Sequence, residues 1–506
     1  MKMKTRKFMK YFYITLLIII LAASIYIRFK NLAERSLWLD EAWVANAITE
    51  SNLKELITSS FHAPLFFVLT IHLIVSFLPN NELFLRLLPC LFGIGTLIIF
   101  YSIIRKHTGK LAALISLLLL SFSYNFVHYS QELKQFSGAM FFTILLVYLC
   151  ERVIAHNKMG DWIALLLMSI IGIGFDHSTV FIIATVFIVL LISFHQKQYW
   201  IKTFGFGSAV FAFFAVFFLF HLRHQIARSL VSAQQYWTSY YPNLNSFSAF
   251  IKWLSHSTIK IFDFFSFPYF PVSLIIIIAG LFLFHKRSQR RFVIYILLPI
   301  ILVLAASFFK RYPYGGSRMM IFVAPLLYIS FAKGLDFIIN KLERSKLYIP
   351  ILVLVVFIAV PPVSSFIEIA KNPLRLEEVR PLLDELQGHI ELGDQIYVYY
   401  GAKEAFKYYY STRYHRLIDK NNIIWGEKHR DDVNKYGIDL EEILKKNTSI
   451  WFLFSHFWES ERSYIFDYLD RHGDLEMEIS SIGTIAYRFK ITSNPSDLQD
   501  LNQPYN

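Results

Sequence analysis

Long apolar runs recur through the first 366 residues of this chain, and they limit its possible folds more than any other feature. A helix needs about 20 predominantly apolar residues to cross a bilayer, and eleven runs reach or approach that length. They lie at residues 11–29, 83–104, 111–129, 135–150, 162–176, 179–194, 203–222, 271–284, 292–309, 318–332 and 347–366. Only 17% of the chain is charged, and both cysteines, Cys90 and Cys150, lie within apolar runs. The pattern excludes a soluble enzyme, a disordered chain and a disulfide scaffold. It predicts a polytopic α-helical membrane protein with about 11 transmembrane helices.

Charge divides the chain into two parts. Residues 1–366 hold 33 Lys and Arg against 13 Asp and Glu, whereas residues 367–506 hold 17 against 24. A basic excess of this kind is typical of the short cytoplasmic loops of a membrane domain, so the net charge of +13 does not indicate a nucleic-acid partner. We expect a transmembrane domain at 1–366, an acidic extracytoplasmic α/β domain at 367–492 and a flexible tail at 493–506.

Basic residues between the apolar runs predict how the chain crosses the membrane. They gather in every second connection, at residues 2–10, 105–110, 152–158, 197–202, 286–291 and 333–346. Because basic loops stay in the cytoplasm, we expect a multi-pass protein of the cytoplasmic (inner) membrane, with the N-terminus inside and the C-terminal domain outside. The first run is too long for a cleaved signal peptide and is expected to be a retained anchor. The shorter runs at 64–78 and 247–267 are expected to lie at the membrane surface.

The C-terminal part alternates helical and strand patterns. Helices are expected at 374–390, 403–410 and 459–471, and strands at 395–400, 450–454, 475–480 and 484–490. This pattern indicates a small α/β domain. It contains no phosphate-binding glycine loop, no nucleophile elbow and no metal-spaced cluster, so a packing or acceptor-docking role is expected for it.

Acidic residues at membrane depth persist when they are paired or when they work in an aqueous cavity. Asp40 and Glu41 follow the first span, and Glu132 lies between the third and fourth spans. Under the predicted topology all three lie at the outer end of the helices and are candidate functional residues. The alternative for Asp40 and Glu41 is a helix N-terminus capped by acids. For Glu132 the alternative is an ion pair with Lys134 or another nearby basic residue.

Cationic side chains in apolar surroundings are predicted at the same outer end. His62 precedes Ala63-Pro64, Arg86 follows Glu82 by one helical turn, and Arg318 follows two glycines that would allow close approach of a ligand. A structural hydrogen bond for His62, an ion pair with Glu82 for Arg86 and contact with lipid headgroups remain alternatives. Acids that activate a hydroxyl, together with cations that hold a phosphate, indicate transfer from a lipid-linked phosphate donor.

Four short motifs resemble those of the GT-C glycosyltransferases, in the bacterial branch similar to dolichyl-phosphate-mannose protein mannosyltransferases and the lipid A aminoarabinose transferase. They are LWLDE at 37–41, HAPL at 62–65, LRLLP at 85–89 and YSQELKQF at 129–136, in the family's order and spacing. The segment 314–327, with Arg318 and Pro325, resembles a later family helix. Ala63, Lys134 and Phe136 replace the proline, arginine and tyrosine that are usual in the family.

The resemblance implies an inverting transfer of a hexosyl or pentosyl group from a polyprenyl-phosphate donor to a hydroxyl of a glycan, lipid or protein. Asp40, with Glu41 beside it, would be the general base. Glu132 would orient the acceptor or one of the cations. Binding of the donor phosphate is assigned to Lys134, Arg318, Arg86 and His62. Some relatives use a divalent cation and others use none; Asp40, Glu132 and His62 are the residues that would share one here.

Other classes of protein remain open from the sequence. A ligase or polymerase with a pyrophosphate-linked oligosaccharide donor differs only in donor chemistry. A lipid-linked-sugar carrier would favour internal repeats and broken helices at mid-membrane, which this sequence does not display. A scaffold that presents the C-terminal domain would leave the acids at 40 and 132 unexplained.

Overall fold

The computed structural model describes residues 2–50, 56, 63–194, 196–223, 225–226, 234–286, 289–430, 432–445 and 449–492. The chain forms two compact units. The membrane unit comprises Met1–Leu32, Asn52–Leu78 and Leu83–Pro373, and the sheet unit comprises Ala33–Ser51, Pro79–Glu82 and Leu374–Asn506. The sheet unit thus includes two short segments, 33–51 and 79–82, that the sequence analysis gave to the transmembrane domain.

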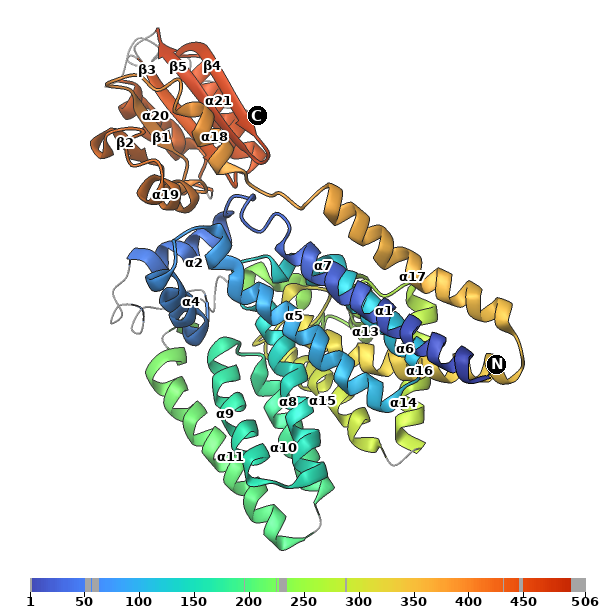
Figure 1. Ribbon diagram of the computed structural model, residues 1–506. Coiled ribbons are helices and arrows are strands. Elements are labelled where there is room, and N and C mark those ends of the chain that lie inside the picture. The colour runs from blue at the N-terminus through green and yellow to red at the C-terminus, as the bar shows by residue number, and fades with distance from the viewer. Residues whose placement is uncertain are drawn as a thin grey trace. The chain divides into compact units, whose positions relative to one another are not determined.

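The membrane unit is helical (Figure 1). Its helices are α1 (Lys2–Phe29), α4 (Leu65–Phe77), α5 (which begins at Glu82 and ends at His107), α6 (Lys110–Phe122), α7 (Tyr124–Ser130), α8 (Phe136–His156), α9 (Met159–Phe175), α10 (Thr179–Ser193), α11 (Lys197–Phe217), α13 (Phe247–Phe264), α14 (Phe270–Lys286), α15 (Arg290–Phe308), α16 (Ala324–Arg344) and α17 (Tyr348–Lys371). A π-helical turn, Phe218–Leu222, extends α11, and a 3₁₀ helix, Arg318–Val323, leads into α16.

Among the described residues, seven helices are long and apolar enough to cross a membrane, or eight if α6 and α7, which meet at a 57° bend, form one span. The helices α9, α10 and α14 coincide with the remaining three predicted runs but are only 15 to 17 residues long. The 13-residue α4 is the run that we expected not to span. These helices confirm a polytopic helical membrane protein.

The connections that the sequence predicts to be cytoplasmic lie together in the membrane unit. Lys333 Nζ donates to the carbonyl of His107 at 2.7 Å, and the His107 ring lies 4.6 Å from that of Phe292. Arg291 Nε lies 2.6 Å from Glu151 Oε1 at the end of α8. Four of the six basic segments therefore meet at one end of the helix bundle, as alternate crossing of the membrane requires. The side of the membrane on which this end lies stays a prediction.

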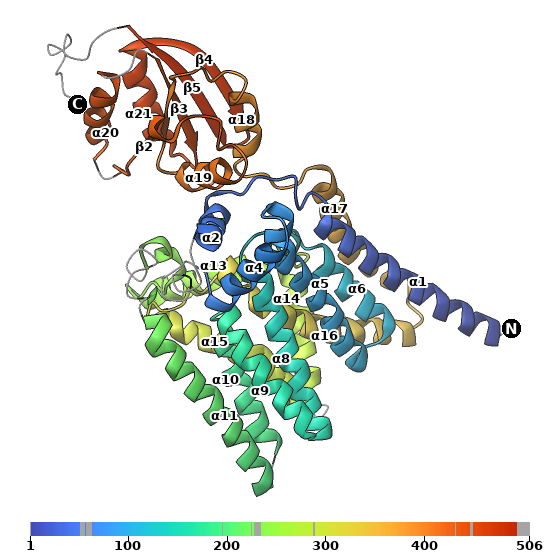
Figure 2. The same cartoon turned by 60° about the vertical axis from the view of Figure 1, so that its left-hand side comes forward.

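The sheet unit contains a five-stranded sheet of order β2-β1-β3-β5-β4. Its strands are β1 (Gln395–Val398), β2 (Ile423–Trp425), β3 (Ser449–Ser455), β4 (Gly473–Ser481) and β5 (Thr484–Ile491), and β1 is parallel to both β2 and β3 whereas β5 is antiparallel to β3 and β4. Four helices follow the expected alternation: α18 (Val379–Leu386), α19 (Lys403–Thr412), α20 (Asn434–Leu444) and α21 (Glu459–Asp470). Figure 2 shows these helices around the sheet.

The central strand β3 is buried along almost its whole length because it lies between β1 and β5. Side chains of α20 and α21 pack with alternate residues of β1 and β3 in one apolar cluster. The α/β architecture predicted for the C-terminal part is therefore confirmed. The first predicted helix, at 374–390, is wrong at both ends, because α18 spans only Val379–Leu386 and the segment before it makes polar contacts with residues 33–41.

The segment 33–51 forms helix α2 (Leu39–Glu50) and packs against α19. Asn46 Nδ2 donates to Glu404, both to its carboxylate at 2.8 Å and to its backbone carbonyl at 2.9 Å. The helix that carries the LWLDE motif is thus built into the sheet unit.

Candidate active site

The YSQELKQF segment joins α7 to α8 and is fixed by the side chain of Gln131. Its amide nitrogen lies 2.8 Å from the carbonyl of Ile27 and 2.9 Å from that of Lys30, so it donates to backbone groups at the end of α1. The last carbonyls of a helix lack intrahelical partners, and the Gln131 amide supplies one. Sequence reasoning gave Gln131 no role, although an amide beside the acidic position was a visible signal.

Both charged residues of this segment are buried. Glu132 is 1% exposed and Lys134 is 5% exposed. Glu132 Oε2 lies 3.6 Å from Nε2 of His128, one helical turn earlier in α7. A nearby basic partner for Glu132 was one of the two expectations, and the described contact is with His128. Burial of a carboxylate and an ammonium group in an apolar bundle costs free energy, so such groups are usually paired or take part in binding or catalysis.

Arg318 reaches the same region from the other half of the membrane unit. Its guanidinium carbon lies 5.4 Å from the centroid of the Phe136 ring, the first residue of α8 and two positions after Lys134. A cation over an aromatic face is held electrostatically, and Arg suits this geometry because its group is planar. The structure therefore brings Arg318 next to the segment that carries Glu132 and Lys134.

The two glycines before Arg318 serve a different purpose from the one expected. A Cβ at Gly316 would lie 2.1 Å from the carbonyl oxygen of Lys260, and one at Gly315 would lie 2.9 Å from the Tyr240 ring. Gly315 also has φ +150°, a backbone conformation that favours glycine. The close approach that these glycines permit is to the protein itself.

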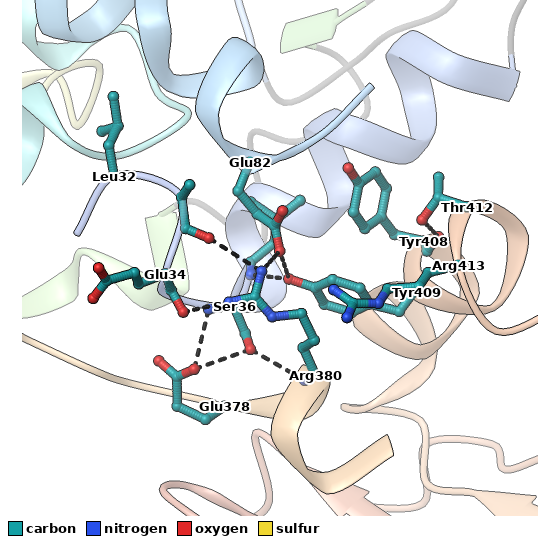
Figure 3. A network of polar contacts seen from close by, with 12 residues as sticks. Leu32, Glu34, Ser36, Glu82, Glu378, Arg380, Tyr408, Tyr409, Thr412 and Arg413 are labelled. Carbon is teal, nitrogen blue, oxygen red and sulfur yellow. Dashed lines mark hydrogen bonds and ion pairs between the residues drawn. The ribbon is translucent and has the colours of Figure 1, made fainter. Parts of the chain in front are cut away.

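Arg86 is fully buried in α5 and donates to the carbonyl of Leu32 at 2.9 Å. Glu82, the ion-pair partner considered for it, lies in the sheet unit and accepts from Arg380 at 2.7 Å and from the Tyr409 hydroxyl at 3.0 Å. Figure 3 shows this network, in which the Arg380 guanidinium also contacts the carbonyls of 33 and 34.

The acidic segment 38–41 opens helix α2 in the sheet unit. Asp40 is partly exposed, whereas Glu41 is 1% exposed. The N–H of Leu39 donates to Glu377 Oε2 at 3.0 Å, and both the N–H and the hydroxyl of Ser36 contact Glu378 Oε2. Acids at the start of a helix are favourable, as expected, but the N–H of Leu39 is satisfied by a carboxylate more than 300 residues away in the sequence.

Sequence reasoning missed the residues of the C-terminal domain that lie around this segment, which are Glu377, Glu378, Arg380 and His456. His456 Nδ1 lies 2.7 Å from Glu377 Oε1. The hydrogen bond to Glu377, and the charges of Glu377 and Asp40, raise the pKa of His456 above its ordinary value, while burial opposes them. The acidic pair Glu377-Glu378, immediately before α18, was a signal in the sequence for part of this set.

The three residues proposed to share a metal ion belong to different parts of the chain. His62 lies outside the described residues, Asp40 belongs to the sheet unit and Glu132 to the membrane unit. Within the part of the chain that the structure describes, no group of three or more His, Cys, Asp and Glu side chains is arranged to hold a metal ion. A divalent cation stays an untested expectation.

Known proteins match this chain in two ways. Residues 62–222 match the family model described as dolichyl-phosphate-mannose-protein mannosyltransferase, a segment that includes Arg86, Glu132 and Lys134. No curated protein sequence matches the chain. Among solved structures, apo ArnT from Cupriavidus metallidurans is similar over 93% of this chain and 97% of its own, at a TM-score of 0.58 and 11% identity.

The chain has the fold of ArnT. A second structure of ArnT, with bound undecaprenyl phosphate, is similar over 97% of this chain and 99% of its own, at a TM-score of 0.52 and 10% identity. The resemblance drawn from the four motifs is confirmed. The family model covers residues 62–222, and the similar solved structures extend the likeness of fold over almost the whole chain.

Proposed function

We propose that this GT-C protein moves a hexosyl or pentosyl group from a polyprenyl-phosphate donor to a hydroxyl of a glycan, lipid or protein at the outer face of the cytoplasmic membrane. The observation that carries the proposal is the gathering of Glu132, Lys134 and Arg318 around the start of α8. Lys134 is buried and Arg318 is partly buried, and cations with little access to water bind a phosphate more strongly than fully exposed ones do. The similar fold of ArnT with bound undecaprenyl phosphate supports the same class of donor.

The reaction is a single displacement with inversion. Asp40 takes the proton of the acceptor hydroxyl, and the oxygen attacks the anomeric carbon from the side opposite the phosphate. The bond between that carbon and the phosphate oxygen breaks, so polyprenyl phosphate leaves with its electron pair. Lys134 and Arg318 stabilise the charge that develops on the leaving group, and Arg86 and His62 are the further cations assigned to it. Glu132 orients the acceptor or one of these cations.

The test is transfer by purified protein in liposomes that contain a panel of polyprenyl monophosphate sugars and the matching pyrophosphates. We expect consumption of one monophosphate donor, release of polyprenyl phosphate and a product of inverted anomeric configuration. Consumption of pyrophosphate donors alone would contradict the proposal and favour a ligase or polymerase. Movement of an intact donor across the bilayer, without bond cleavage, would favour a carrier.

A further inference from the structure

The carboxylate of Glu377 joins the start of helix α2 to the end of strand β3. Its Oε2 accepts from the N–H of Leu39 at 3.0 Å and from the hydroxyl of Ser455 at 3.3 Å, and its Oε1 lies 2.7 Å from Nδ1 of His456. Glu377 is only 7% exposed. A buried carboxylate with three such partners has little freedom to move, so it fixes where α2 begins relative to the sheet.

His456 is placed beside the same helix by an unusual backbone. Its φ is +48°, a left-handed conformation that is uncommon outside glycine, although asparagine, aspartate and histidine adopt it more often than other residues do. Gly401 provides the space for it, because a Cβ at 401 would lie 2.6 Å from the carbonyl oxygen of His456. Strain of this kind is retained where the surrounding structure holds the residue in place.

The imidazole of His456 faces the acidic segment of α2. Its ring centroid lies 6.4 Å from that of Trp38. The charged groups around it are Glu377, Asp40 of α2 and Arg430, and the two carboxylates outweigh the arginine, so the pKa of His456 is raised. The cationic form of His456 therefore interacts favourably with both carboxylates, with that of Glu377 through a hydrogen bond and with that of Asp40 through its charge.

We propose that Glu377 and His456 are positioning residues for Asp40, so that the C-terminal domain forms part of the catalytic machinery. Glu377 fixes the first turn of the helix that carries Asp40. The positive charge of the His456 imidazolium favours the ionised form of the Asp40 carboxylate. This proposal rests on the function proposed above, and it differs from the packing or docking role that the sequence suggested for the domain.

The proposal has a signature in the pH dependence of transfer. A general base must be ionised, so activity falls as pH drops through the pKa of Asp40. A nearby positive charge lowers that pKa, and its loss should move the acid limb of the profile to higher pH, here by up to about one unit because the site is partly exposed. We expect His456→Gln to lower kcat about tenfold, less than loss of the base itself, with the donor KM unchanged.

The experiment compares His456→Gln and Glu377→Gln with His429→Asn as a matched control. His429 belongs to the same domain and also pairs with a carboxylate, Asp439, at 2.7 Å. Transfer is measured against pH for the full chain in liposomes. Loss of kcat in both variants, with the acid limb moved to higher pH in His456→Gln and a normal profile in the control, would support the proposal. A normal profile for His456→Gln, or an equal loss in all three variants, would overturn it.

A second measurement does not depend on activity. Diethylpyrocarbonate modifies neutral imidazole, so its rate at His456 against pH, followed by mass spectrometry, reports the pKa of that residue. We expect a raised value in the unmodified chain and a lower one in Asp40→Asn. Identical values would overturn the proposal even if His456→Gln failed to fold. If the chain transferred no sugar from any donor while the two values differed, the proposed function would fail and the pairing of His456 with Asp40 would stand.

Discussion

The side chains at positions 40 and 41 differ in how far water reaches them. Asp40 is partly exposed and Glu41 is buried, so only Asp40 is accessible to an acceptor hydroxyl. We expect Asp40→Asn to lower transfer by about 10²-fold or more, because asparagine keeps the size of the side chain but cannot take a proton. Glu41→Gln should be milder. Sugar transfer by membranes that carry each variant at matched expression measures both.

A role for Asp40 limited to capping the helix predicts a different result. Asparagine caps a helix N-terminus as well as aspartate does, so Asp40→Asn would then transfer sugar at a near-normal rate. That outcome would remove Asp40 as the base and assign the role to Glu132.

The buried ammonium of Lys134 should matter for its charge. Lys134→Ala and Arg318→Ala are expected to weaken use of the donor while the protein still inserts and folds. Lys134→Arg should retain more function than Lys134→Gln, because a charge-assisted contact to phosphate is stronger than a neutral one. The measurement is the donor KM and kcat in liposomes. Equal activity of the Gln and Arg variants would show that Lys134 does not bind the phosphate.

At the scale of elements, helices α14 and α16 pack closely through two glycines. A Cβ at Gly334 would lie 1.9 Å from the carbonyl oxygen of Ile276, and one at Gly280 would lie 2.0 Å from that of Ser330. Small residues allow such close approach of helices in a membrane. The two helices would have to separate to admit any side chain at either position.

We therefore expect Gly334→Val to lower the free energy of unfolding by about 2 kcal/mol or more, as overpacking does. Gly205→Ala is the matched control, because nothing lies within 4 Å of a Cβ at that position of α11. Alanine in an open helical site should stabilise by about 0.5–1 kcal/mol. Thermal unfolding in detergent measures both variants. A Tm for Gly334→Val equal to that of the unmodified chain would show that the helices are not held at this distance.

At the scale of the whole molecule, the predicted topology places the C-terminus outside the cytoplasm. A reporter that is active only in the cytoplasm, fused after Asn506, should therefore be silent. The same reporter inserted within 286–291 should be active, because that segment is basic and belongs to the end of the bundle where the basic connections meet. Activity after Asn506 would contradict the span count and the outward orientation of the C-terminal domain.

The sequence by itself determined the elements with a strong local pattern. Apolar runs predicted the helices of the membrane unit, since a run of that length can be satisfied only as a helix in lipid. Strand patterns predicted β1, β3, β4 and β5, with boundaries close to those observed. The motif at 129–136 indicated the charged residues Glu132 and Lys134, which are buried in the membrane unit. Strand β2 was missed because three residues are too few to show a period. Helix α20 was also missed.

Only the tertiary structure decided how the functional residues are supported. Segment 33–51 belongs to the sheet unit because Glu377, Glu378 and Arg380 bind its backbone and side chains across more than 300 residues of sequence. The position of His456 beside Glu377 and Trp38 depends in the same way on the end of β3. A periodic pattern in the sequence reports which face of a helix or strand is buried. A hydrogen bond between distant segments leaves no periodic trace, because it needs only one donor and one acceptor that folding brings together.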